Sequence, residues 1–206
     1  LSALGSVKTV ALNLFDMQAV KVFSEKVANE YPDLKYLVNS AGYFSPKPFL
    51  EHTVADYDIY HNFNKAFFFI TQTVAKVMVA NGGGSIVNIG SMWAKQAIKA
   101  TPSSAYSMAK AGLHSLTQHL AMELADSNIR VNAVSPAIVV TPIYGSFIEE
   151  SKIEETLQGF NAFHPIGRVG RPEDIAKTIQ FLLGDDSSWV TGAIWDIDGG
   201  VIAGRN

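Results

Sequence analysis

The chain has 206 residues, 48% of them hydrophobic, so a single domain with a sizeable core is expected. The net charge is −3, without a basic run, which argues against nucleic acid as a partner because phosphate binding needs clustered Lys and Arg. The lack of cysteine excludes disulfides, thiolate metal sites and a cysteine nucleophile. No apolar stretch is as long as a membrane span and no signal peptide is evident, so we expect a cytoplasmic protein without a membrane partner.

Short apolar runs alternate with longer helical patterns along the chain. Strands are predicted at 8–14, 35–38, 85–91, 129–135 and 193–200, and helices at 16–31, 54–80, 103–125, 147–160 and 172–184. The strands are apolar at most positions, as in parallel sheets that are buried on both faces. The alternation therefore predicts an α/β fold, with a doubly wound parallel sheet between two helical layers and one domain spanning 1–206. Ligands bind beyond the carboxyl ends of such strands, which here are the segments 39–44, 90–96 and 135–144.

A tyrosine and a lysine occur four residues apart in the helix predicted at 103–125. Tyr106 and Lys110 would lie one turn apart on the same helix face. A Lys ammonium beside a phenol favours the phenolate and so lowers the pKa of the tyrosine, which suits a general acid or base. The pair alone is a weak motif, and by itself a tyrosine packed at the edge of a surface helix is the better explanation.

A serine just beyond a buried strand changes this balance. Ser91 follows the strand predicted at 85–91 and precedes Tyr106 by fifteen residues, a loop long enough to fold back onto the helix. Its hydroxyl would then hold a carbonyl oxygen while Tyr106 gives or takes a proton. A polar residue that merely starts a loop is the simpler alternative.

Six stretches together resemble the short-chain dehydrogenase/reductase family in order and spacing. They cover almost the whole chain and are "VNSAG" (38–42), "SIVNIGS" (85–91), "YSMAK" (106–110), "IRVNAVSPAIVVTP" (129–142), "PIGRVGRPEDIA" (165–176) and "VTGAIWDIDGG" (190–200). The resemblance implies a Rossmann-type fold and an oxidoreductase that transfers a hydride between NAD or NADP and a carbonyl or alcohol. The sequence does not show which of the two cofactors is preferred.

The resemblance also implies roles for individual residues. Tyr106 would be the catalytic acid/base, Lys110 would lower its pKa and hold the cofactor ribose, and Ser91 would hold the substrate oxygen. A fourth catalytic residue, an asparagine of the long helix, matches Asn64 when counted forward from Tyr57, whereas Asn62 remains an alternative because the segment is one residue short. Besides Tyr106 and Lys110, the implied cofactor-binding residues are Asn13, Asn39, Ala41, Gly42, Pro136, Val139 and Thr141.

Substrate contacts are expected from the loop after Ser91 and from the segment after Thr141. Besides Ser91 and Tyr106, the candidates are Trp93, Gln96, Tyr144 and Phe147. The aromatic candidates indicate an apolar wall, but nothing in the loop identifies the small-molecule substrate. We expect no metal site, since His114 and His119 are five residues apart and do not share a helix face.

The family pattern begins with a strand, a Gly-rich phosphate-binding loop and a helix, and no such stretch occurs in this sequence. The resemblance therefore implies that the working protein carries roughly 40–50 further N-terminal residues, the size of such a unit. It also implies a homotetramer or homodimer. Two alternatives remain, a non-catalytic binding or scaffold protein on the same fold and a family member with net isomerase or lyase activity.

Overall fold

The computed structural model describes residues 5–99 and 101–204. Within them, a single parallel sheet has the strand order β1-β2-β3-β4. The strands are β1 (Tyr36–Asn39), β2 (Gly84–Ile89), β3 (Ile129–Pro136) and β4 (Ile194–Ile197). The predicted α/β fold with a parallel sheet is thus confirmed.

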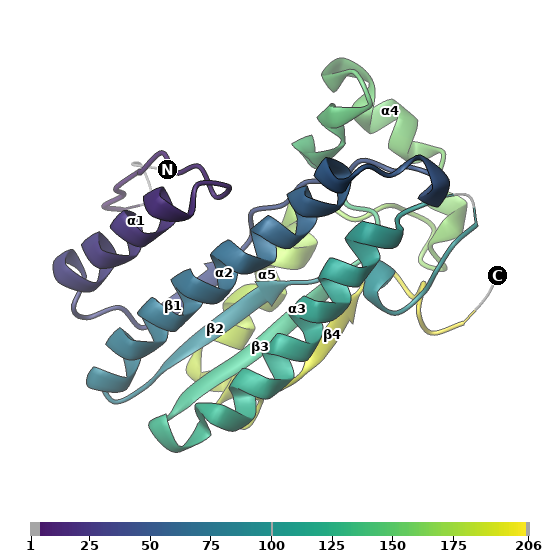
Figure 1. Ribbon diagram of the computed structural model, residues 1–206. Coiled ribbons are helices and arrows are strands. Elements are labelled where there is room, and N and C mark those ends of the chain that lie inside the picture. Colours follow the sequence, from purple (N-terminus) through teal and green to yellow (C-terminus); the bar gives the residue numbers. More distant parts are fainter. Residues whose placement is uncertain (1–4, 100, 205–206) are drawn as a thin grey trace.

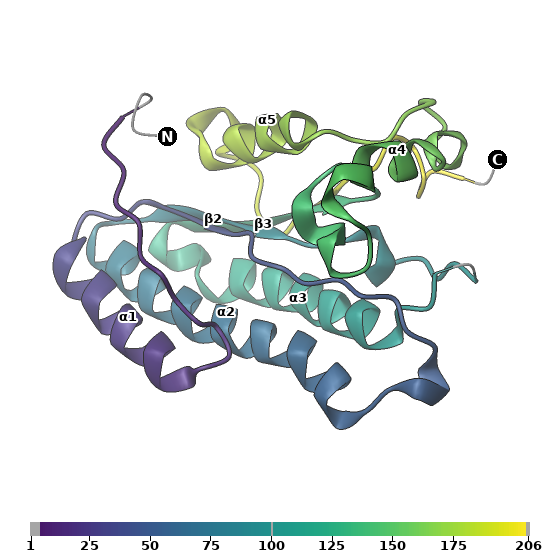
Figure 2. The same cartoon turned by 90° about the horizontal axis from the view of Figure 1, so that it is seen from above.

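Helices cover both faces of the sheet (Figures 1 and 2). The helices are α1 (Met17–Glu30), α2 (Val54–Ala80), α3 (Ser104–Glu123), α4 (Ile153–Gln158) and α5 (Pro172–Leu183). Figure 2 shows α2 and α3 against one face, with α1 beside α2 in the same layer, and α5 on the opposite face. The segment with α4 lies beyond the carboxyl ends of the strands (Figure 1).

Capping residues explain where the helices of the first layer begin. The Asp16 carboxylate accepts hydrogen bonds from two backbone N–H groups in the first turn of α1. Thr53 and Asp56 form a reciprocal capping box at the start of α2. These caps satisfy N–H groups that have no partner inside the helix, so both helices begin where local sequence dictates.

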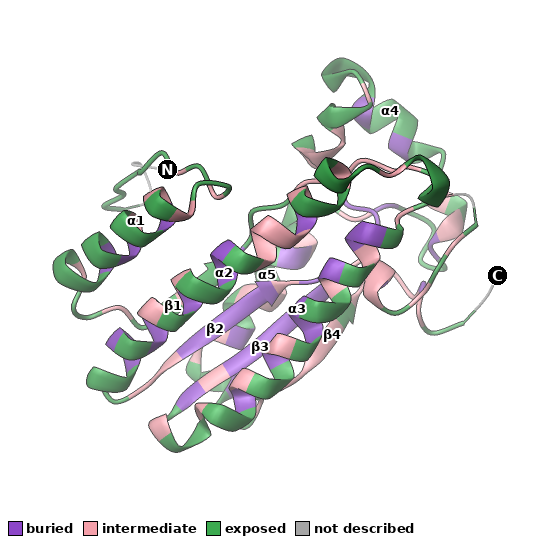
Figure 3. Ribbon diagram, in the orientation of Figure 1, coloured by how far each residue is buried: buried purple, intermediate pink, exposed green. Residues whose placement is uncertain are grey.

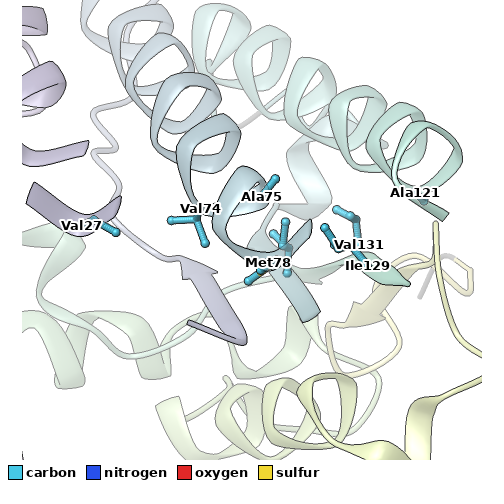
Figure 4. Packing of buried hydrophobic residues seen from close by; sticks show 8 residues of the cluster. Val27, Val74, Ala75, Met78, Ala121, Ile129 and Val131 are labelled. Carbon is cyan, nitrogen blue, oxygen red and sulfur yellow. The ribbon is translucent and has the colours of Figure 1, made fainter. Parts of the chain in front are cut away.

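The core lies between the sheet and the α1–α3 layer. Figure 3 shows that β2 and β3 are the most buried strands, and Figure 4 shows their side chains packed against those of the helices. This cluster consists of Val27, Val74, Ala75, Met78, Ile86, Ala121, Ile129 and Val131. A second cluster, on the other face, packs Val87 and Val134 against Ile175 and Leu182 of α5. Burial on both faces fits the apolar strand pattern.

Two predicted elements are wrong. Residues 8–14, predicted as a strand, form none, and in the described part of the chain no strand pairs with them. The segment is largely exposed, with Val10 47% accessible, because an apolar run becomes a strand only beside a partner that accepts its hydrogen bonds. The helix predicted at 147–160 is reduced to α4, preceded by a short 3-10 helix at Glu150–Lys152.

Candidate functional site

A cavity of about 650 Å³ lies at the carboxyl ends of β1, β2 and β3. Residues from all three segments that were predicted to bind a ligand, 39–44, 90–96 and 135–144, line this cavity. Residues of α5 line one side of it. The lining residues from these segments include Ser40, Ala41, Gly42, Phe44, Gly90, Ser91, Trp93, Pro136, Val139, Thr141 and Tyr144. Tyr106 and Lys110 reach the same cavity from α3. The structure therefore brings the three central candidates, Ser91, Tyr106 and Lys110, into one site.

Ser91 is held by the turn that follows β2. It is the N-cap of the short 3-10 helix Met92–Ala94, and its hydroxyl oxygen accepts a hydrogen bond from the Trp93 N–H at 3.3 Å. Its own backbone N–H donates to Nε2 of His114 at 3.4 Å. The residue is 5% exposed. Its hydroxyl is therefore fixed by local structure and does not depend on a mobile loop.

Tyr106 lies in the first turn of α3 and is buried by aromatic rings. Phe44 and Tyr60 meet its ring edge to face, with ring centroids 4.9 and 5.6 Å away. Burial raises the pKa of the Tyr106 phenol above its ordinary value, and a hydrogen bond with the Ser91 side chain opposes this increase only in part. The phenol therefore keeps its proton at neutral pH.

Lys110 lies one turn further along α3. Its ammonium donates a hydrogen bond to the Ile89 carbonyl at 2.6 Å and lies 5.7 Å from the centre of the Tyr106 ring. Burial lowers the pKa of Lys110 to about 8. The Tyr–Lys spacing predicted a lowered tyrosine pKa, and for the net shift this is wrong, because desolvation of the phenol is the largest contribution and the hydrogen bond with Ser91 offsets it only in part.

Asn64 contacts the same helix but does not line the cavity. Its Nδ2 donates to the Ala109 carbonyl at 2.7 Å, between Tyr106 and Lys110 in sequence. The alternative, Asn62, does not line the cavity either. Asn64 thus connects α2 to the part of α3 that carries the site.

The candidate cofactor residues divide into two groups. Ala41 and Gly42 line the cavity, as do Pro136 at the end of β3 and Val139 and Thr141 after it. Asn39 lies beneath it, where its Nδ2 donates to Thr71 and Asn88 in a buried hydrogen-bond chain. Asn13 is exposed in the turn before α1, and its side-chain oxygen accepts from the Phe15 N–H. The structure therefore does not bring Asn13 to the site.

The candidate substrate residues also separate. Trp93 and Tyr144 line the cavity, whereas Gln96 lines a different one beside Ile98. Phe147 is not among the lining residues; it is half exposed and packs on Phe44 and Tyr144.

Sequence reasoning missed His114. It follows Lys110 by one helical turn, so α3 contacts the end of β2 twice, through the Ile89 carbonyl and through the Ser91 N–H. A Cβ on the intervening Gly90 would lie 2.0 Å from the imidazole, so only glycine fits there. Burial lowers the pKa of His114 to about 4, which keeps its Nε2 free to accept. Tyr106, Lys110 and His114 are spaced four residues apart and so lie on one face of the helix, and this spacing was the sequence signal for His114.

Two other classes of site, a metal centre and a membrane-spanning helix, find no support in the described residues. The described residues contain no group of three or more His, Asp or Glu side chains placed to hold a metal ion. In the same part of the chain, no helix combines the length and the apolar character needed to cross a bilayer.

Comparison with known proteins places this geometry in context. The family described as "Enoyl-(Acyl carrier protein) reductase" matches residues 1–202. The 3-oxoacyl-[acyl-carrier-protein] reductase FabG of Thermotoga maritima is 38% identical over 200 residues, which cover 96% of this chain and 78% of that protein. The chain belongs to the short-chain dehydrogenase/reductase family. L-xylulose reductase of Bos taurus is 35% identical over the same shares of the two chains.

Solved structures agree with this assignment. A putative NAD(P)-dependent gluconate 5-dehydrogenase from Beutenbergia cavernae, with bound NADP, superposes with a TM-score of 0.87 at 29% identity. The match covers 98% of this chain and 80% of that one. This short-chain dehydrogenase/reductase is therefore an NAD(P)-dependent oxidoreductase with a Rossmann-type fold.

Proposed function

We propose that the protein reduces a ketone to a secondary alcohol, with Tyr106 as the proton donor and Ser91 as the group that holds the carbonyl oxygen. The observation that carries the proposal is the meeting of the Ser91 hydroxyl and the Tyr106 phenol in the wall of one cavity. Two hydroxyl groups that converge on one point can both bond a carbonyl oxygen as negative charge develops on it. One of them must then transfer its proton.

The residues around the cavity fit the nicotinamide end of NAD(P). Ser40, Ala41 and Gly42 are small and exposed after β1, so a flat ring can approach their backbone. Lys110 has donor capacity beyond its bond to the Ile89 carbonyl and would hold the ribose, and the Thr141 hydroxyl would contact the carboxamide. When bound, the cofactor supplies the hydride.

The protonation states favour reduction at neutral pH. Because burial raises the pKa of Tyr106, its phenol is present in the form that donates a proton. Lys110, with a pKa of about 8, still carries its charge at pH 7 and would stabilise the phenolate that remains after donation. Lys110 would thus act on the charged form of Tyr106, although it does not lower the pKa below the ordinary value.

The test has two stages. Fluorescence titration of the full-length protein with NADH and with NADPH should give saturable binding of at least one, and so reveal the preference. Ketone-dependent loss of the reduced-nicotinamide absorbance should follow, stoichiometric with alcohol formed. Binding without turnover would favour a scaffold role, and cofactor that returns unchanged would favour an isomerase or lyase.

Self-association is a second part of the proposal. Phe68 and Phe69 of α2 and Met122 of α3 are 45%, 43% and 81% exposed, which is unusual for large apolar side chains. We propose that this helical layer joins copies of the chain into a homodimer or homotetramer. Light scattering should then give a multiple of the single-chain mass, and a single-chain mass would contradict it. A cytoplasmic location stays a prediction.

A further inference from the structure

The relatives do not identify the substrate, since their names refer to compounds as different as a carrier-bound acyl group, a sugar, a steroid and cyclohexanol. The side chains around Ser91 and Tyr106, at the reacting end of the cavity, indicate the class of substrate instead. Around Ser91 and Tyr106 the cavity is lined by Phe44, Trp93 and Tyr144, which we call the aromatic wall, and by Ile143.

The aromatic wall is pre-formed. Phe44 is 7% exposed and contacts Tyr106, Tyr144 and Phe147 edge to face, with ring centroids between 4.9 and 6.5 Å apart. The Phe44 carbonyl accepts a hydrogen bond from the Ser146 hydroxyl at 2.5 Å, which joins the loop after β1 to the segment after β3. The wall is therefore held from both sides, and a ligand meets a surface that is already shaped.

The polar atoms of the neighbouring tyrosines are already used by the protein. The Tyr60 hydroxyl accepts from the Ser45 N–H and donates to the Ser45 carbonyl. The Tyr144 hydroxyl bonds to the backbone of Val139. Of these two tyrosines, Tyr144 lines the cavity and presents the hydrocarbon of its ring there, and the hydroxyls of Ser91 and Tyr106 are taken by the reacting oxygen.

Charge is scarce at this site. In the described part of the chain, Lys110 is the one charged side chain among the lining residues, and its ammonium is bonded to the Ile89 carbonyl and has its remaining donors assigned to the cofactor ribose in the proposed function. Nearby Lys95 is paired with Asp196 at 2.7 Å. A carboxylate or phosphate on the substrate would thus lose its water without gaining a free cation, and a polyol would leave hydroxyls unpaired.

From this arrangement we propose that the site takes uncharged ketones, and the matching secondary alcohols, whose body is hydrocarbon. The inference rests on the proposed function. In the reaction, a hydride from the reduced nicotinamide forms the new C–H bond at the carbonyl carbon. The Tyr106 proton forms the O–H bond, so the ketone is reduced and the nicotinamide oxidised. The reverse reaction oxidises the alcohol.

A matched pair of ketones tests the proposal. With the full-length protein and the preferred reduced cofactor, kcat/KM is measured for 4-methylcyclohexanone and for 4-oxocyclohexanecarboxylate, which share ring and carbonyl and differ in charge. L-xylulose, a ketone with several hydroxyl groups, is the third substrate and represents the polyols. We expect 4-methylcyclohexanone to be preferred by at least about a hundredfold over both, because sites discriminate strongly when a polar group is left unpaired.

A variant sharpens this test. Ile143→Lys places a cation among the lining residues and should raise kcat/KM for the carboxylate relative to 4-methylcyclohexanone by about tenfold or more. Ile143→Met is the matched control, unbranched but uncharged, and should leave the order of substrates unchanged. If Ile143→Met changed the ratio of the two kcat/KM values as much as Ile143→Lys did, the charge of the substrate would not be the property that the site discriminates.

The outcomes separate the two proposals. If the nucleotide binds and the carboxylate or the polyol is reduced as well as 4-methylcyclohexanone, the substrate inference is overturned while the proposed function stands. If no nucleotide binds, or no ketone is reduced, the proposed function fails and the substrate inference fails with it.

Discussion

The carboxyl end of the sheet and the N-terminal segment 5–16 are both rich in apolar residues, yet they differ in how these are held. At the carboxyl end, Phe44 is 7% exposed and Tyr106 is 8% exposed, each fixed by rings on several sides. In the N-terminal segment, Val7, Val10 and Phe15 are 45–47% exposed. Apolar composition alone therefore does not decide burial, which depends on whether partners surround the side chain.

The same contrast applies to polar groups. The Ser91 N–H and the Ile89 carbonyl each have a side-chain partner on α3, so the turn that carries the site is fixed by the helix that carries Tyr106. Most residues of the N-terminal segment are instead exposed and belong to no strand. Substitutions at the two regions should thus differ in their effect by orders of magnitude.

The largest effect is expected from Tyr106→Phe. Without the phenol the ketone has no proton donor, and kcat should fall at least about a thousandfold while nucleotide affinity is unchanged. Steady-state kinetics and the nucleotide titration measure the two quantities. Tyr36→Phe, at a tyrosine that is 53% exposed on the edge strand, is the control and should retain full activity.

A core substitution should affect stability without touching the site. Met78 is fully buried in the cluster between α2 and the sheet, and Met78→Ala should lower the free energy of unfolding by about 2–5 kcal/mol. Denaturant unfolding measures the change. A loss below about 1 kcal/mol would show that this cluster is loosely packed.

Lys110 should matter through its charge. Lys110→Met should lower kcat roughly a hundredfold, because the phenolate left after proton donation loses its counter-charge and the Ile89 carbonyl loses its donor. With a pKa of about 8, Lys110 is protonated below that pH, so wild-type reduction should decline as the pH rises above about 8. A rate that stays flat to pH 10 would contradict this role.

His114 should act by positioning Ser91. His114→Leu removes the acceptor of the Ser91 N–H, and kcat should fall about tenfold, since small displacements of a catalytic group are costly. His114→Gln retains an acceptor and should restore part of the rate. Equal losses in the two variants would assign the histidine to packing alone.

The same histidine gives a pH dependence of stability. Its pKa falls from 6.5 to about 4 on folding, so the unfolded chain binds more protons between these values and stability decreases as the pH falls through that window. The decrease amounts to at most about 3.4 kcal/mol. Unfolding curves of wild type and His114→Gln, compared across the window, isolate this contribution from that of the carboxylates.

The smallest effect is expected at Val10. Val10→Ala should change the free energy of unfolding by less than about 0.5 kcal/mol, because the side chain is half exposed in the unpaired segment. Denaturant unfolding again measures it. A loss similar to that of Met78→Ala would show that the two regions do not differ as described.

Much of the site was predictable because its residues are set by local rules. The i, i+4 spacing put Tyr106 and Lys110 on one helix face, and the end of a buried strand fixed Ser91. Other predictions needed knowledge of packing. Side chains alternate along a strand, and Asn39 points into the buried polar chain beneath the cavity. The helical spacing places His114 on the same face of α3 as Tyr106 and Lys110, but its hydrogen bond with the Ser91 N–H depends on α3 crossing the end of β2, which the spacing does not show.

Edges of the fold were harder to predict for a different reason. Residues 8–14 have the composition of a strand. A strand also needs a neighbouring strand to pair with, and the sequence near residues 8–14 does not indicate which segment that would be. Gln96 was assigned to the substrate because it follows Ser91 closely. The 3-10 helix Met92–Ala94 turns the chain away, so that Gln96 lines another cavity.

The most direct test of the central claim is isotope transfer from the cofactor. The reduced nicotinamide, deuterated at its reactive carbon in either configuration, is incubated with 4-methylcyclohexanone and the full-length protein, and the product is analysed by mass spectrometry and NMR. If hydride passes from the nicotinamide to the ketone, one of the two labelled cofactors will deliver deuterium to the carbinol carbon. Alcohol that carries no label from either cofactor, or a product formed without cofactor oxidation, would contradict this transfer.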